Sequence, residues 1–222
     1  MHLIRIRFSL SDCRRFLRCC FFLFLASGTP FLCGQDLPEF TQGTVMVFRS
    51  VTRGYEYNFV LRIAQFRPGC YFEWEGQSNQ GTVYLKPQAV EEARKYNSQR
   101  LFQNGIDAES AEETTYWFSR ALLSEVKQKR KASIFLDSLK TQISLVAEEP
   151  FTLSVNQKKV SLSAVVLKDG RGGQWWILDN PDNPLVLQRK INSFTESLAS
   201  IDTTRADTLR WIKGRKLKQY AP

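Results

Sequence analysis

Alternating apolar and polar side chains predict antiparallel strands in the first half of the chain. The clearest case is 55–63, where Tyr55, Tyr57, Phe59, Leu61 and Ile63 share one side. A period of two is typical of a half-buried strand. Further strands are predicted at 43–51, 70–75 and 82–85, with turns at Arg53-Gly54 and 67–69. Four short strands at this spacing indicate an antiparallel meander.

The periodicity becomes helical after Pro87. Proline is favoured in the first turn of a helix, so a helix is predicted over 88–97. Residues 98–113 are polar and are expected to form a loop, and 114–118 to form a strand. Ser119 can cap a second helix over 120–129, whose apolar residues have helical spacing.

Strand patterns then return until the end of the domain. They are predicted at 132–137, 141–147, 151–155, 159–167, 174–178 and 185–191, and 192–201 is predicted to be one helical turn or a last strand. Glu148 and Glu149 are expected to be loop charges. The expected fold is mainly β (α+β), a single curved antiparallel sheet or half-barrel with two short helices inserted.

The first 34 residues have the layout of an export signal. Five arginines precede and flank an apolar run at 19–26, and small residues follow it. We expect cleavage of 1–34, a single domain over 35–204 and a basic tail over 205–222. The alternatives are an uncleaved anchor and a lipoprotein acylated at Cys33. The expected location is periplasmic, in the cell envelope or secreted.

Removal of the leader also removes the histidine and most of the cysteines. His2 is the only histidine, and four of the five cysteines lie within 1–34. The remaining chain lacks the residues for a Ser-His-Asp triad, a Cys-His pair or a Cys/His zinc site. Cys70 is expected to be a buried small hydrophobe, the alternative being a reactive thiol. No cofactor and no metal are expected.

The net charge of +9 lies at the two ends of the chain. The leader has five arginines against one aspartate, and 205–222 has six basic residues against one aspartate, so 35–204 is neutral. A neutral body argues against nucleic-acid binding. The tail is either solvated or in contact with anionic lipid head groups.

Two groups of polar residues have a functional and a structural interpretation. Glu73 and Glu75 lie on one face of a strand and could form the carboxylate pair of a His-independent hydrolase. The alternative is a solvated face. Oxygen ligands at Asp179, Asn180, Asp182 and Asn183 could bind a cation, but Asx and Pro residues also build tight turns. We favour the structural interpretation for both groups.

Aromatic residues on the predicted strands are the main indication of a ligand-binding site. Adjacent Trp175 and Trp176 must point to opposite faces of their strand, so both faces are covered or one lines an apolar groove. A curved sheet crossed by helices could hold an acyl chain or a similar ligand. The residues predicted to line the ligand site or core are Tyr57, Phe59, Phe72, Trp74, Trp117, Trp175 and Trp176.

The order of elements resembles the lipoprotein-carrier proteins of the bacterial envelope, the LolA/LolB-like half-barrels. The resemblance rests on the leader, the early meander, the helical insertion and the returning strands around QWWILDNPDNPLVL, and it covers about 40–200. It implies a convex sheet around a hydrophobic cavity. We therefore expect a non-enzymatic envelope protein that binds a lipid or an envelope protein partner. The alternatives are a structural or assembly component of the cell surface and the carboxylate hydrolase.

Overall fold

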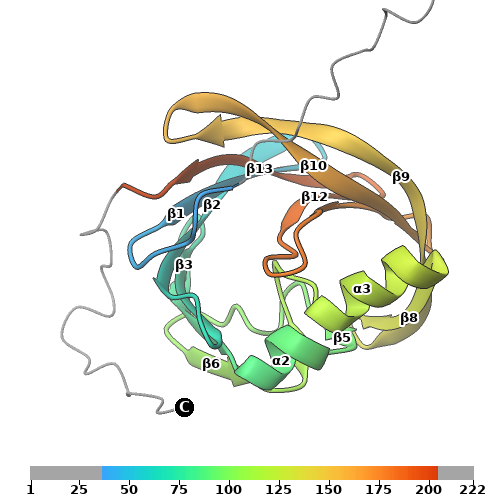
Figure 1. Cartoon of the computed structure of the whole chain (residues 1–222). Helices are drawn as coiled ribbons and strands as arrows, with labels where there is room; N and C mark the ends of the chain where they lie inside the picture. Colours follow the sequence, from blue (N-terminus) through green and yellow to red (C-terminus); the bar gives the residue numbers. More distant parts are fainter. Residues whose placement is uncertain (1–36, 205–222) are drawn as a thin grey trace, which may run out of the picture. The chain divides into compact units, whose positions relative to one another are not determined.

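The computed structural model describes residues 37–204, which form one curved β-sheet with two short helices (Figure 1). The predictions for the leader, Cys33 and the basic tail lie outside this range. The mainly β fold with two inserted helices is confirmed. None of the helices within 37–204 is long and apolar enough to cross a membrane.

The sheet contains thirteen strands, and most neighbouring pairs are antiparallel. Their order across the sheet is β6-β4-β3-β2-β1-β13-β12-β11-β10-β9-β8-β5-β7. The strands are β1 (Val45–Thr52), β2 (Tyr55–Gln65), β3 (Cys70–Glu75), β4 (Gln80–Leu85), β5 (Lys95–Tyr96), β6 (Asp107–Ser110), β7 (Glu113–Thr114), β8 (Lys131–Leu136), β9 (Leu139–Val155), β10 (Lys158–Asp169), β11 (Gln174–Leu178), β12 (Val186–Ile191) and β13 (Phe194–Asp202).

The long hairpin of β9 and β10 bends the sheet into a partial ring. The first part of β9 pairs with β8, and its last residues, Ser154 and Val155, pair in parallel with Ser200 and Ile201 of β13. Figure 1 shows this hairpin arching over β13. Strands β10 to β13 therefore form a ring that β9 closes.

Two-residue turns fix the register of the hairpins. Arg53 and Gly54 both have positive φ, as do Asn156 and Gln157 between β9 and β10. Paired positive φ values match the twist of antiparallel strands in a tight hairpin. The turn predicted at Arg53-Gly54 is confirmed.

Helix α2 (Pro87–Glu92) is shorter than predicted, whereas α3 (Arg120–Lys129) begins as expected. The Ser119 side chain accepts a hydrogen bond from the Leu122 amide at 3.2 Å, which caps α3. The prediction that the first helix reaches residue 97 is wrong. Tyr96 instead joins β5 and packs its ring on Trp175 at 5.1 Å, so tertiary packing overrides the local helical pattern.

Other boundaries also differ from the predictions. Strand β9 runs without interruption through Glu148, Glu149 and Pro150, which pair with β10, so the expected loop there is wrong. The polar segment 98–113 includes the short strand β6, paired with β4. In the predicted strand 114–118, Thr114 belongs to β7 and Trp117 makes an isolated bridge to Leu185. The last-strand alternative for 192–201 is confirmed by β13.

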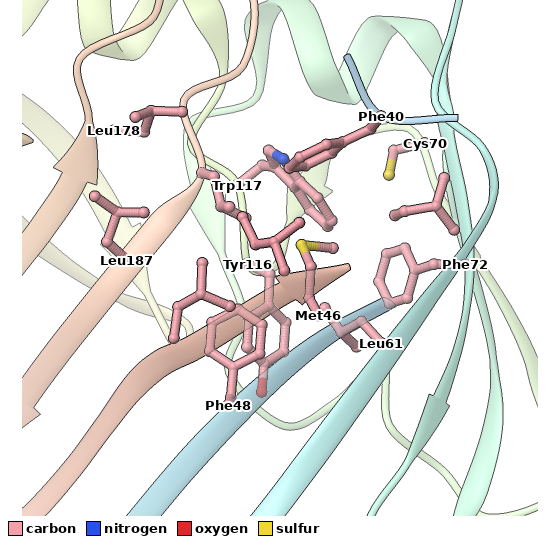
Figure 2. Close-up of a cluster of buried hydrophobic side chains, with 14 of the residues drawn as sticks. Phe40, Met46, Phe48, Leu61, Cys70, Phe72, Tyr116, Trp117, Leu178 and Leu187 are labelled. Carbon is pink, nitrogen blue, oxygen red and sulfur yellow. The ribbon is translucent and has the colours of Figure 1, made fainter. Parts of the chain in front are cut away.

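Apolar side chains gather into two cores. Figure 2 shows part of the first core, where Phe48 and Tyr116 lie on one side of Met46 and Phe72 on the other. The buried residues of the first core are Phe40, Met46, Phe48, Leu61, Ile63, Cys70, Phe72, Trp74, Val83, Leu85, Leu101, Tyr116, Trp117, Leu153, Val155, Leu162, Ala164, Leu178, Leu185, Leu187, Leu198 and Ile201. The second core lies beneath α3 and comprises Tyr96, Phe118, Leu122, Leu123, Val126, Ala132, Ile134, Leu136, Ile143, Leu145, Val165, Leu167, Trp175, Ile177 and Val186.

Gly81 packs against the first core and leaves no room for a larger side chain. A Cβ there would lie 2.8 Å from the Ile106 carbonyl oxygen and 2.9 Å from Trp74 Nε1. We predict that Gly81→Ala lowers the free energy of unfolding by about 1–3 kcal/mol through overpacking. Gly76→Ala is the matched control, because its nearest contact would be an ordinary 3.7 Å. Urea unfolding measures both; equal losses in the two variants would contradict the packing argument.

Cys70 is a free, buried thiol in the first core. Burial raises the pKa of the Cys70 thiol, so the reactive thiolate is suppressed in the folded protein. We predict that a disulfide reagent labels Cys70 of the chain lacking residues 1–34 very slowly in the native state, and rapidly in guanidinium chloride. Similar labelling rates in both states would show an accessible thiol.

Candidate functional site

An open cavity of about 520 Å³ lies on the concave side of strands β2, β3, β12 and β13. Six of its sixteen lining residues are aromatic, and a charged pair is buried beneath them. The lining residues are Tyr57, Phe59, Trp74, Gly76, Gln77, Ser78, Asn79, Ser98, Gln99, Phe102, Tyr116, Asp137, Arg189, Ile191, Phe194 and Glu196.

A row of directly paired residues crosses the sheet beneath the cavity. Tyr57 of β2 pairs with Ser50 of β1, Ser50 with Glu196 of β13, Glu196 with Arg189 of β12, and Arg189 with Trp175 of β11. Directly opposed residues in antiparallel strands project from the same face. The register therefore brings an aromatic ring, a hydroxyl, a carboxylate and a guanidinium together from four strands.

Arg189 and Glu196 form a buried ion pair at the bottom of the cavity. Arg189 Nε donates to Glu196 Oε2 at 2.8 Å, and the residues are 6% and 5% exposed. Ser50 Oγ donates to the other carboxylate oxygen at 3.0 Å. Buried charges need such partners, because desolvation without compensation is costly.

Tyr116 adds a third donor to the carboxylate. Its hydroxyl donates to Glu196 Oε1 at 3.1 Å, and its backbone amide donates to the Tyr96 hydroxyl at 3.3 Å. Tyr116 has a φ of 56°, in the left-handed region, and lies between β7 and α3. Both phenols stay protonated, since burial raises the pKa of Tyr116 well above its usual value and that of Tyr96 to about 12.

Four aromatic rings form the wall beside the ion pair. The Phe59 ring stacks with Trp74 at 5.7 Å and with Tyr116 at 5.6 Å between centroids. Phe102 meets the Phe59 ring edge-on at 5.2 Å. Offset and edge-on contacts are the favourable arrangements of aromatic rings, so this wall is held rigidly before any ligand enters.

Polar residues surround the opening. Gln77, Ser78, Asn79 and Gln99 are exposed at this rim. The carboxylate of Asp137, in the turn between β8 and β9, accepts hydrogen bonds from the Ser98 amide at 2.7 Å and the Ser98 hydroxyl at 2.9 Å. The cavity therefore has a polar mouth, aromatic walls and a charged floor.

The predicted site residues separate into three groups. Tyr57, Phe59 and Trp74 line the cavity. Phe72 and Trp117 are buried in the first core, and Trp175 in the second core. Trp176 lies on the opposite face of β11 from Trp175 and contacts Glu149 and Lys190 through a hydrogen bond and a cation–π contact. Both faces of β11 are thus covered.

The pattern of aromatic strands did not identify Arg189, Glu196, Tyr116, Phe102 or Phe194. One signal for the ion pair was present in the sequence. On the predicted strand, Arg189 lies two residues from apolar Leu187 and two from apolar Ile191. The three side chains therefore share one face, and Arg189 occupies an inward position. A charge at an inward position needs a buried partner, and Glu196 supplies it across the following turn.

Glu73 and Glu75 lie outside this cavity. Glu73 is buried, paired in register with Arg62 and Thr82, and Glu75 forms an ion pair with Arg62 at 2.7 Å. The inward residues of this strand are Phe72 and Trp74, so the two carboxylates belong to its opposite face. Sequence reasoning placed them on one face, but they do not border the cavity.

The Asx-rich turn between β11 and β12 is occupied by protein contacts. Lys127 binds Asp179 at 2.5 Å, Trp117 Nε1 donates to Asn183 at 2.9 Å, and the Asp182 amide donates to the Asn180 side chain at 2.9 Å. These contacts attach the turn to α3 and to the segment before it. Within 37–204, no group of three or more His, Cys, Asp and Glu side chains is arranged to hold a metal ion.

Comparison with known proteins gives no match to a family model, a curated protein or a solved structure.

The ion pair makes a specific prediction for stability. Glu196→Ala leaves the Arg189 charge buried without a partner, so we expect a loss of about 3–5 kcal/mol in the free energy of unfolding. Replacing both residues, as Arg189→Met with Glu196→Leu, removes the charge and should recover part of this loss. Urea unfolding compares the three proteins. A double variant as unstable as the single one would contradict the role of the uncompensated charge.

Proposed function

We propose that this protein is an exported binding protein that holds the apolar part of a small amphipathic ligand, such as a lipid acyl chain, in the aromatic cavity. The observation that carries the proposal is the cavity itself. Its volume of about 520 Å³ falls within the range of roughly 300–1,000 Å³ common for small-molecule sites.

The aromatic residues at the cavity contrast with those in the cores. Tyr57, Phe59, Phe102 and Phe194 each keep part of their surface accessible, although they lie beside fully buried rings. Apolar surface left in water costs about 25 cal/mol per Å² relative to burial. A ligand that covers these rings would recover that free energy, and the stacked wall would need no rearrangement to receive it.

The chemistry of the cavity favours binding over the hydrolase alternative. Glu196, its buried carboxylate, accepts hydrogen bonds from Arg189, Ser50 and Tyr116. Asp137 at the rim is held by Ser98. Both carboxylates are engaged as structural acceptors, whereas a carboxylate hydrolase needs an acid and a base directed at its substrate.

Export supports a lipid or another amphipathic envelope molecule as the ligand. The leader and the resemblance to lipoprotein carriers both point to the cell envelope, where acylated molecules are abundant. Contact between the basic tail and anionic lipid would bring the protein to a surface that holds such ligands.

Ligand binding in the cavity is measured by titrating a fluorescent fatty acid, cis-parinaric acid, into the purified protein. Tyr57→Ala removes one aromatic ring that lines the cavity, and we predict that it raises the Kd about three- to tenfold, as expected for the loss of an aromatic contact. Tyr55→Ala is the matched control, because Tyr55 lies on the same strand but is 76% exposed and does not line the cavity. The control should keep wild-type affinity.

Failure to bind would refute the proposal. The same is true if Tyr57→Ala and Tyr55→Ala bind the probe with equal affinity, because binding would then not involve the cavity. Circular dichroism of both variants checks that the sheet is intact.

A further inference from the structure

We propose that the ligand carries a carboxylate, and that Arg189 binds this head group at the floor of the cavity while the aromatic wall contacts the apolar part. This inference rests on the proposed function and specifies its ligand as an apolar monocarboxylate, such as a free fatty acid.

The first argument is the hydrogen-bonding capacity of the guanidinium. Arginine has five N–H donors, and the ion pair with Glu196 uses Nε. Within residues 37–204, no hydrogen bond is found for the two terminal Nη groups. Neither Nη group is fully enclosed by protein, so solvent reaches both. Because Arg189 is 94% buried and lines the cavity, that access is through the cavity.

The second argument is the orientation of the guanidinium. Glu196 binds it from the neighbouring strand through Nε, and the Phe194 ring covers its face at 5.2 Å from the central carbon. The guanidinium is therefore held at Nε and on one face, while its two Nη groups keep unused donors. The fork of Nη groups matches the two oxygens of a carboxylate in a bidentate contact.

The third argument concerns the neighbouring charges. Glu196 partly neutralises Arg189, but its own charge is shared among three donors, including Ser50 and Tyr116. Asp137 lines the exposed rim, where water and its hydrogen bonds to Ser98 moderate its field. A ligand carboxylate at the floor thus gains charge-assisted hydrogen bonds from a guanidinium already fixed in place.

The position of the polar group sets the direction of the ligand. The positive charge of the cavity lies at its buried floor, whereas the mouth is ringed by exposed amides, hydroxyls and the Asp137 carboxylate, so an anionic head group binds at the floor. The apolar part then lies along Phe59 and Phe102 toward the mouth. A head group that needs extensive hydration, such as a phosphate, fits a buried floor less well than a carboxylate.

The test compares cis-parinaric acid with its methyl ester, which has the same chain and no anionic head. We expect the wild-type protein to bind the acid at least about tenfold more tightly, as charge-assisted hydrogen bonds predict. In the double variant Arg189→Gln with Glu196→Gln, which leaves no uncompensated charge, the acid should lose this advantage while the ester keeps its affinity.

Arg189→Lys is a second variant that keeps the charge and the ion pair but loses the fork. It should show an intermediate preference for the acid. Equal binding of acid and ester by the wild-type protein would overturn the carboxylate inference and leave the proposed function standing. Binding of neither probe would overturn both, and an undiminished preference for the acid in a folded double variant would exclude Arg189 as the recognising group.

Discussion

The cavity depends on the buried ion pair between Arg189 and Glu196. The two residues face each other on adjacent antiparallel strands, so the register of β12 and β13 creates the pair without any loop. Glu196 is then tied to elements from elsewhere in the chain. Glu196 is bound by Ser50 of β1 and by Tyr116 before α3, and Arg189 is covered by Phe194. A single carboxylate thereby connects the first strand, the last strand and the helical insertion.

The position of the aromatic wall also depends on the buried ion pair. The hydroxyl of Tyr116 reaches the carboxylate, and its ring becomes the surface on which Phe59 stacks at 5.6 Å. Phe59 in turn positions Trp74 and Phe102. Phe59, Trp74, Arg189 and Glu196 lie on strands, which hold a site more rigidly than loops do, whereas Phe102 and Tyr116 come from the segments beside β6 and β7.

Sequence patterns predicted the sheet well because period-two alternation is a local property. The strand at 55–63, the hairpin at Arg53-Gly54 and the cap at Ser119 all depend on residues close in sequence. The errors came from contacts between distant segments. Tyr96 leaves a helical pattern to pack on Trp175, and Pro150 stays within β9 because β10 and β13 hold that hairpin in place. The cavity was predicted only in part for the same reason. Tyr57, Phe59 and Trp74 lie in the early meander. Arg189, Glu196 and Tyr116 come from later segments that the tertiary fold brings beside it.

The pairing of β1 with β13 has a consequence for biogenesis. The two strands lie next to each other in the sheet, yet they are the first and the last to be synthesised. Until β13 emerges, β1 has one unpaired edge and the ring closed by β9 is incomplete, so a growing chain exposes a template for pairing with other chains. The topology thus couples protection from aggregation to the arrival of the C-terminal strand.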